Sequence, residues 1–139
     1  MATAANTESL YASARCWNAG DLDGYLTIYA PTIVHHGLDP RGSLDSGGNR
    51  QNYEHTYAAF AGSTLTVEMV VADGDLLASR FRLVGVHVAE FMGIAMTGRR
   101  IDLRGQNMMR FVNGKVVERW TVADVSGLLH QLGATNRSP

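Results

Sequence analysis

Four polar side chains interrupt otherwise apolar, strand-like segments of this chain. They are His36, His87, Asn107 and Asp124. Carboxylates and imidazoles carry protons, and an amide both donates and accepts hydrogen bonds, so this set suits general acid–base chemistry on a bound organic molecule. Each side chain also has a structural interpretation: a strand histidine in the core, an Asn that bonds the backbone or Trp120, and an Asp that caps the next helix.

No motif for a metal or cofactor is found in the sequence. It has no G-x-G-x-x-G, no phosphate-binding loop, no G-x-S-x-G, and no C-x-x-C or H-x-x-x-H spacing. His35 and His36 are adjacent, so on a strand they point to opposite faces and cannot chelate one ion together. The sequence therefore favours chemistry without a bound cofactor or metal, or a binding role.

The segment NMMRFVNGKVVERWTVAD, residues 107–124, positions two of the candidates. Asn113-Gly114 between apolar segments predicts a hairpin with a two-residue type I′ turn. Regular pairing from that turn sets Asn107 opposite Trp120. Thr121 then points to the other face of the hairpin, unless a β-bulge shifts the register.

The rest of the chain predicts helices followed by long antiparallel strands. Helix patterns cover residues 7–19, 22–30, 49–60 and 125–133, and strand patterns cover 32–37, 65–71, 76–90, 101–112 and 116–123. This order predicts an α+β fold in which helices pack on one face of a curved sheet and enclose an apolar cavity. Phe91 and Met92 lie in the Gly-flanked loop 91–100, where they either cover a flat substrate or pack in the core.

Size and charge narrow the class of protein. The 139 residues favour one domain, and the net charge of −1 gives no general attraction to nucleic acid or membrane. No apolar run approaches the roughly 20 residues of a membrane span, and no secretion signal is visible, so we expect a cytoplasmic protein. Cys16 has no partner for an internal disulfide. Six arginines are expected on solvated strand faces or at a sheet-to-sheet dimer interface: Arg80, Arg82, Arg99, Arg100, Arg104 and Arg110.

Several motifs together resemble the SnoaL-like polyketide cyclase family over residues 1–139. They are a G-x-H strand, the loop GIAMTGRR, an M-R-x-x-x-G-K hairpin, a strand with Trp and Asp, and a terminal L-x-Q-L-G; W-N-A-G-D and H-G near the start fit too. The resemblance implies a single domain with the cone-shaped α+β barrel of the nuclear transport factor and ketosteroid isomerase superfamily. It also implies an apolar cavity, a homo-oligomer with a dimer favoured, and a role in aromatic polyketide antibiotic pathways.

The departures from the family pattern are informative. Family cyclases close a ring by an intramolecular aldol reaction without a cofactor, with an Asp as acid/base and a His and a Gln that bind substrate. Counted from the hairpin turn, that Asp falls at Thr121, the His at Asn107 and the Gln at Gly105. Thr does not carry a proton near neutral pH as a carboxylate does, and Asp124 matches a family Asp that is not the catalytic one. The resemblance is therefore closer to hydroxylase-type members of anthracycline biosynthesis.

The leading hypothesis is hydroxylation of a polycyclic quinone or hydroquinone, with molecular oxygen as co-substrate, no bound cofactor and a separate reductase as the electron source. The residues expected to act catalytically are Asn107, Thr121, His36 and Asp124. Those expected to bind the aromatic polyketide are Trp120, His87, Phe91, Met92, Met109 and Gly105. Two alternatives stay open: an aldol cyclase whose acid has moved to Asp124, and a non-catalytic small-molecule binding protein.

Overall fold

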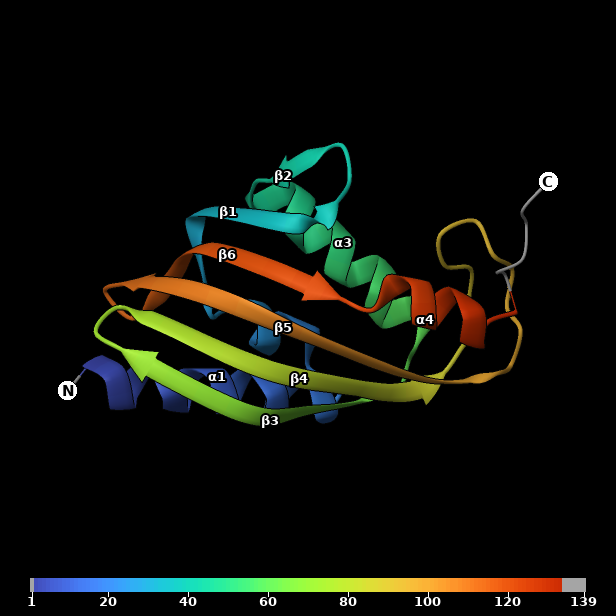
Figure 1. Cartoon of the computed structure of the whole chain (residues 1–139), viewed down its shortest axis with the longest axis horizontal. Coiled ribbons are helices and arrows are strands. Elements are labelled where there is room, and N and C mark those ends of the chain that lie inside the picture. Colours follow the sequence, from blue (N-terminus) through green and yellow to red (C-terminus); the bar gives the residue numbers. More distant parts are fainter. Residues whose placement is uncertain (1, 134–139) are drawn as a thin grey trace.

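The computed structural model describes residues 2–133, which form one curved six-stranded sheet with helices packed against it (Figure 1). The elements are α1 (Ala2–Asn18), α2 (Leu22–Leu26), β1 (Tyr29–Asp39), β2 (Gly42–Leu44), α3 (Ser46–Ala59), β3 (Thr64–Asp73), β4 (Leu76–Val86), β5 (Arg100–Val112), β6 (Lys115–Ala123) and α4 (Val125–Gln131). The strand order is β2-β1-β6-β5-β4-β3, with β1 parallel to β6 and the other neighbours antiparallel. The expected α+β fold is confirmed, and the sheet curves without closing into a complete barrel. None of the helices in residues 2–133 is long and apolar enough to cross a membrane.

The helices begin and end where local chemistry allows. α1 begins five residues earlier than predicted, because the Ala-rich start has a high helix propensity. α3 also begins earlier, since the Asp45 carboxylate accepts the Gly48 amide at 2.9 Å and caps the helix. Asp124 caps α4 in the same way, with its Oδ1 2.9 Å from the Gly127 nitrogen. The capping interpretation of Asp124 is therefore confirmed.

Strand β1 differs most from expectation. The pattern at residues 22–30 predicts one helix, but α2 ends at Leu26 and the chain is already a strand at Tyr29. Tyr29 pairs with Val116 of β6, and the Val116 amide donates to Ile28 O at 2.9 Å. Parallel pairing with β6 thus overrides the local helix propensity.

Strand β4 is shorter than the predicted segment 76–90. It ends at Val86, and the amide of Val88 donates to Ala59 O at the end of α3 at 2.8 Å instead of continuing the sheet. The chain therefore leaves the sheet here and forms the loop that leads back to β5.

The β5–β6 hairpin has the predicted turn but not the predicted register. Asn113 and Gly114 have φ of 51° and 78°, as a type I′ turn requires. Between Val116 and Glu118 a β-bulge shifts the pairing, so Asn107 pairs with Thr121. The predicted pairing of Asn107 with Trp120 is wrong, because the extra residue exchanges the two faces of β6 beyond the bulge.

Two apolar clusters lie on the inner side of the sheet. The larger one joins α1, α2 and α3 to the strands and is rich in aromatic rings, including Trp17, Tyr25, Tyr29 and Tyr53. The smaller one surrounds Phe60 near the start of β5 and α4. The half-buried Cys16 packs against the larger cluster as a small apolar side chain. The space that these elements leave open contains the candidate site.

Candidate active site

A cavity of about 580 Å³ lies between the inner face of the sheet and the helices. Its wall is largely apolar, and strands β4, β5 and β6 each contribute inward-facing side chains to it. Its polar strand residues are Ser79, Asn107, Arg119 and Thr121. An apolar cavity with a few grouped polar residues is the usual form of a small-molecule site.

Arg119 is a buried cation on the cavity wall. Its side chain comes from the inner face of β6 and is 6% exposed. Nη1 donates to the hydroxyls of Tyr29 and, at 3.4 Å, Tyr25, and Nε donates to Thr121 Oγ1 at 3.0 Å. Within residues 2–133 no carboxylate lies within ion-pair distance of Arg119, and its Nη2 makes no hydrogen bond. A guanidinium stays charged at any ordinary pH, so this charge is balanced only by neutral dipoles.

The tyrosines around Arg119 do not supply the missing negative charge. Tyr25 and Tyr29 hydroxyls lie 3.1 Å apart, and Tyr29 donates to the Tyr53 hydroxyl at 3.3 Å. Burial raises the pKa of Tyr29 and of Tyr53 above the usual value for a phenol, although the Arg119 charge acts to lower it. Both phenols are therefore neutral, and Arg119 remains a cation without a counterion.

His35 lies behind the cavity wall in a hydrogen-bonded line with two other buried side chains. Its Nδ1 is 2.9 Å from Asn49 Oδ1 and its Nε2 is 2.7 Å from Thr121 Oγ1. An amide oxygen only accepts, so Nδ1 carries the proton and Nε2 accepts one from the Thr121 hydroxyl. Burial, together with the charge of Arg119 and against the hydrogen bond with Asn49, lowers the pKa of His35 to about 3. His35 is therefore neutral at physiological pH.

The hydrogen bonds within the protein determine which donors and acceptors on the cavity wall remain available to a ligand. Thr121 donates to His35 and accepts from Arg119, so its remaining lone pair can accept from a ligand hydroxyl. Asn107 Oδ1 accepts from Ser79 Oγ at 2.9 Å, which leaves Nδ2 as a donor without a partner among the described residues. The site thus presents a cation, an amide donor and one acceptor side by side on β5 and β6.

Gly105 faces the same side of β5 as Asn107, beneath an aromatic ring. A Cβ built at Gly105 would lie 2.4 Å from Phe81 Cζ and 2.9 Å from Val122 O. Phe81 pairs with Gly105 across the strands and lines the cavity. Its ring therefore fills the space in which the family resemblance places a glutamine side chain.

The loop after β4 contributes a tight turn to the cavity wall. Phe91 and Ile94 bond each other's backbone around Met92 and Gly93, whose φ values are 51° and 81°. Positive φ at a Met is uncommon and costs of order 1 kcal/mol. His55 of α3 stacks on Phe91 with ring centroids 5.9 Å apart. Phe91 and Met92 both line the cavity, which is the position that a cover over the ligand would take.

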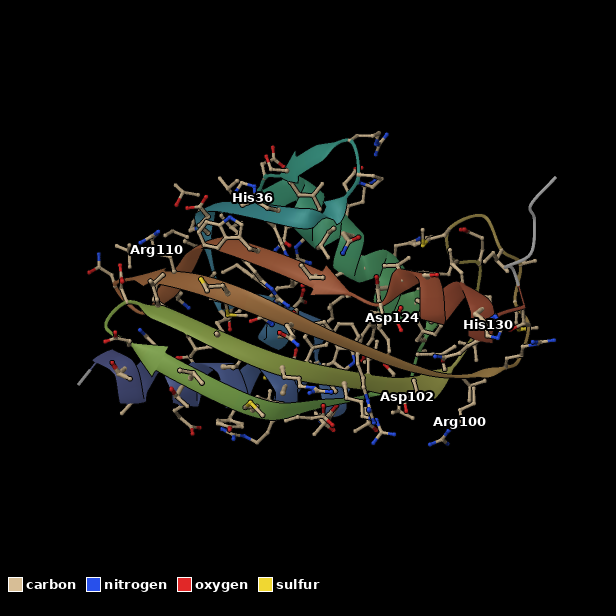
Figure 2. All side chains as sticks on the ribbon, in the orientation of Figure 1. His36, Arg100, Asp102, Arg110, Asp124 and His130 are labelled. Atoms are coloured by element: carbon tan, nitrogen blue, oxygen red, sulfur yellow. The ribbon has the colours of Figure 1, made fainter. Side chains whose placement is uncertain are left out.

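The predicted site residues divide between the two faces of the sheet. Those on the cavity wall are Asn107, Thr121, Met109, Phe91 and Met92, and Gly105 lies on the same face beneath the ring of Phe81. His36, which is labelled in Figure 2, stacks on Trp120 on the outer face with ring centroids 5.5 Å apart. Its Nε2 is 2.8 Å from Glu118 Oε2. Asp124 is exposed at the start of α4 (Figure 2) and is not part of the cavity wall.

His87, the remaining predicted residue, is fully buried near the cavity without lining it. Its ring packs on Phe60 at 5.6 Å, and its Nδ1 lies 2.9 Å from Thr97 Oγ1 and accepts the Thr97 amide at 3.2 Å. These bonds hold the two ends of the loop together. The placement fits the structural interpretation of this histidine.

Sequence reasoning missed Arg119, His35 and the three tyrosines. Alternation along β1 and β6 does not say which face is inward, and the bulge reverses the answer on β6. One signal was available: the family resemblance places Thr121 in the site, and a period of two then places Arg119 on the same face.

The curved sheet, the packed helices and the enclosed cavity define a nuclear transport factor-like α+β fold. The model of the SnoaL-like polyketide cyclase family matches residues 8–132, and the chain belongs to that family. It is thus a member of a family of polyketide-modifying enzymes. A comparison with curated proteins gave no match.

Two solved structures are similar in sequence as well as fold. AclR of Streptomyces galilaeus, a proposed hydroxylase, is 33% identical, with a TM-score of 0.86 over 94% of this chain and 97% of that chain. IdmH of Streptomyces antibioticus, a proposed polyketide cyclase, is 34% identical, with a TM-score of 0.77 over 92% and 98% of the two chains. The two identities are nearly equal, so similarity alone does not choose between hydroxylation and cyclisation.

Proposed function

We propose that this protein hydroxylates the reduced, hydroquinone form of a polycyclic aromatic polyketide. The supporting observation is the uncompensated Arg119 cation on a cavity wall whose only acidic residue, among those described, is the exposed Glu90 of the loop after β4. A cation without a carboxylate base beside it suits a substrate that is already acidic and electron-rich, such as a hydroquinone. Its oxyanion would be the counterion that Arg119 lacks.

The reaction needs no reductant beyond the reduced substrate. One atom of O2 bonds to a ring carbon, the O–O bond then breaks, and the other oxygen leaves as water. The two electrons of the hydroquinone and the two of the ring C–H bond together reduce O2, and the product is a hydroxyquinone. A separate reductase supplies the hydroquinone from the quinone.

The chain's own residues would bind and orient the reacting ring. Arg119 stabilises the hydroquinone oxyanion, and Asn107 Nδ2 donates to a second oxygen on the same edge of the ligand. Phe81 and Met109 form apolar surface against the flat rings and exclude water. Holding one ring edge against β5 and β6 would fix which carbon meets oxygen.

The proposal is tested with chemically reduced quinizarin prepared without air. The reduced dye, with and without protein, is exposed to O2 labelled with a heavy oxygen isotope. The products are separated by chromatography and identified by mass spectrometry. We expect the protein to raise the yield of one positional isomer carrying a single heavy oxygen. Arg119→Met should lose this effect and the outer-face variant Arg110→Met should keep it. An isomer distribution unchanged by the protein would overturn the proposal.

The alternative of ring closure by aldol condensation has support from the similarity to IdmH and from Arg119, which would also stabilise an enolate. It requires a base, and the sequence offers Asp124. Because Asp124 caps α4 and Asn is an equally good cap, Asp124→Asn should leave the fold intact. Loss of ring closure on a linear polyketide substrate in that variant would favour the cyclase. Tight binding of ligands with no turnover in either assay would favour the third reading, a binding protein.

A further inference from the structure

A line of three buried side chains connects the cavity wall to the protein interior. It runs from Thr121 on β6 to His35 on β1 and to Asn49 on α3. We propose that Thr121 and His35 form a proton relay, which removes the proton from a ligand hydroxyl that binds beside Arg119. The ligand class rests on the proposed function, but the relay itself requires only that an acidic hydroxyl enters the cavity.

The geometry allows His35 to reach a ligand only through Thr121. Thr121 lines the cavity, whereas His35 is fully buried and lies behind that wall. The 2.7 Å contact between Thr121 Oγ1 and His35 Nε2 joins a hydroxyl donor to an imidazole acceptor. The guanidinium that bonds Thr121 Oγ1 also stands beside any ligand oxygen that bonds the same atom.

The proton transfer balances without another reactant. The ligand O–H bond breaks as its proton forms a new bond to Thr121 Oγ1, and the proton that Thr121 held passes to His35 Nε2. Thr121 ends neutral, His35 ends as an imidazolium, and the ligand oxygen ends as an anion next to Arg119. Asn49 Oδ1 accepts from the opposite side of the ring and holds it in place throughout.

The charges around His35 favour the proton transfer more when a ligand oxyanion forms beside Arg119. The groups that face it are Arg119 on β6, Tyr53 on α3 and Tyr29 on its own strand, while His36, next to it in the chain, lies on the outer face. Burial opposes protonation of His35 most strongly, and the charge of Arg119 adds to this opposition, because the phenols are neutral. An oxyanion beside Arg119 would offset the part that comes from Arg119. Ionisation of the ligand and protonation of His35 therefore favour each other.

The test uses alizarin, whose visible absorption changes when its hydroxyl ionises. The apparent pKa of the bound dye is measured by titration for wild type and for Thr121→Val, Thr121→Ser and His35→Gln. We expect the valine and glutamine variants each to reduce ionisation of the bound dye about tenfold, and the serine variant to match wild type. Thr121→Val combined with His35→Gln should shift the titration no further than either change alone, because the two groups act in series. Ser13→Ala, which removes a cavity hydroxyl outside the line, is the matched control.

A purely structural role would give a different pattern. If Thr121→Val leaves the titration of the bound dye unchanged, or if serine fails to restore it, the relay is wrong. If His35→Gln does not fold, the valine and serine variants at position 121 decide the matter alone. The assay contains no O2-dependent step, so absence of hydroxylation with an intact titration pattern would reject the proposed reaction and keep the relay.

Discussion

The two faces of the sheet around strands β5 and β6 differ in the partners of their basic side chains. On the outer face basic side chains have carboxylate partners: Arg82 donates two hydrogen bonds to Asp102 at 2.9 and 2.7 Å, and the His36 ring lies 2.8 Å from Glu118. On the inner face Arg119 has only hydroxyl partners. The outer pairs are solvated, so each contributes little to stability. The inner cation is desolvated, so an unpaired charge there is unfavourable. The inner face therefore presents a buried positive charge that, among the described residues, has no carboxylate partner and could bind an anionic ligand.

The largest expected effect is the loss of stability in acid that the buried His35 causes on the inner face. Above the unfolded-state pKa of 6.5 both folded and unfolded chains keep His35 neutral. Below pH 6.5 His35 is protonated in the unfolded chain, whereas in the folded chain it stays neutral down to about pH 3. As the pH is lowered from 6.5 towards 3, we expect the free energy of unfolding to fall by up to about 1.4 kcal/mol per pH unit.

Denaturant titrations between pH 7 and pH 4 measure this slope. His35→Gln should flatten it. An unchanged slope in His35→Gln would show that His35 does not resist protonation in the folded state.

Gly105 gives the next largest effect, on packing of the inner face. Gly105→Ala places a methyl group against Phe81 and the Val122 carbonyl, which should cost about 2 kcal/mol of stability. The matched control is Gly47→Ala in α3, where the new Cβ would be 3.7 Å from its nearest neighbour and should be neutral or stabilising. Thermal or chemical unfolding measures both variants. Equal effects of the two substitutions would mean that Phe81 does not occupy this space.

The smallest effect is expected on the outer face. Arg82→Met removes the pair with Asp102, whose pKa the Arg82 hydrogen bonds hold below its usual value. Because both side chains are about 38% exposed, the loss of stability should be smaller than for Gly105→Ala and should shrink further in high salt. Unfolding at low and high salt tests this. A large, salt-independent loss would contradict the contrast between the faces.

The elements that depend on local pattern were predictable from the sequence. Asn113-Gly114 identified the hairpin turn, and Asp124 identified the start of α4. Both signals are local backbone chemistry that tertiary structure left unchanged. The dimer, and a cover formed by Phe91 and Met92, stay predictions.

The centre of the site was not predictable from alternation, because two features depend on the whole fold. The bulge in β6 inserts one residue without a sequence signal, and it brings Arg119 and Thr121 to the cavity and Trp120 to the outer face. On β1, His35 and His36 are equivalent in sequence until pairing with β6 fixes which one faces inward. The strand-pairing register of the folded sheet is needed to tell which residue faces inward, both on β1 and on β6.

The central claim is that Arg119 binds the anionic oxygen of an aromatic ligand. It is tested by measuring the affinities of alizarin and of its methyl ether, which does not ionise at that oxygen, for wild type, Arg119→Met and Arg110→Met. We predict that Arg119→Met weakens binding of ionised alizarin by about tenfold or more and leaves binding of the ether unchanged, while Arg110→Met alters neither. An equal loss for dye and ether, or no loss for the dye, would contradict the account.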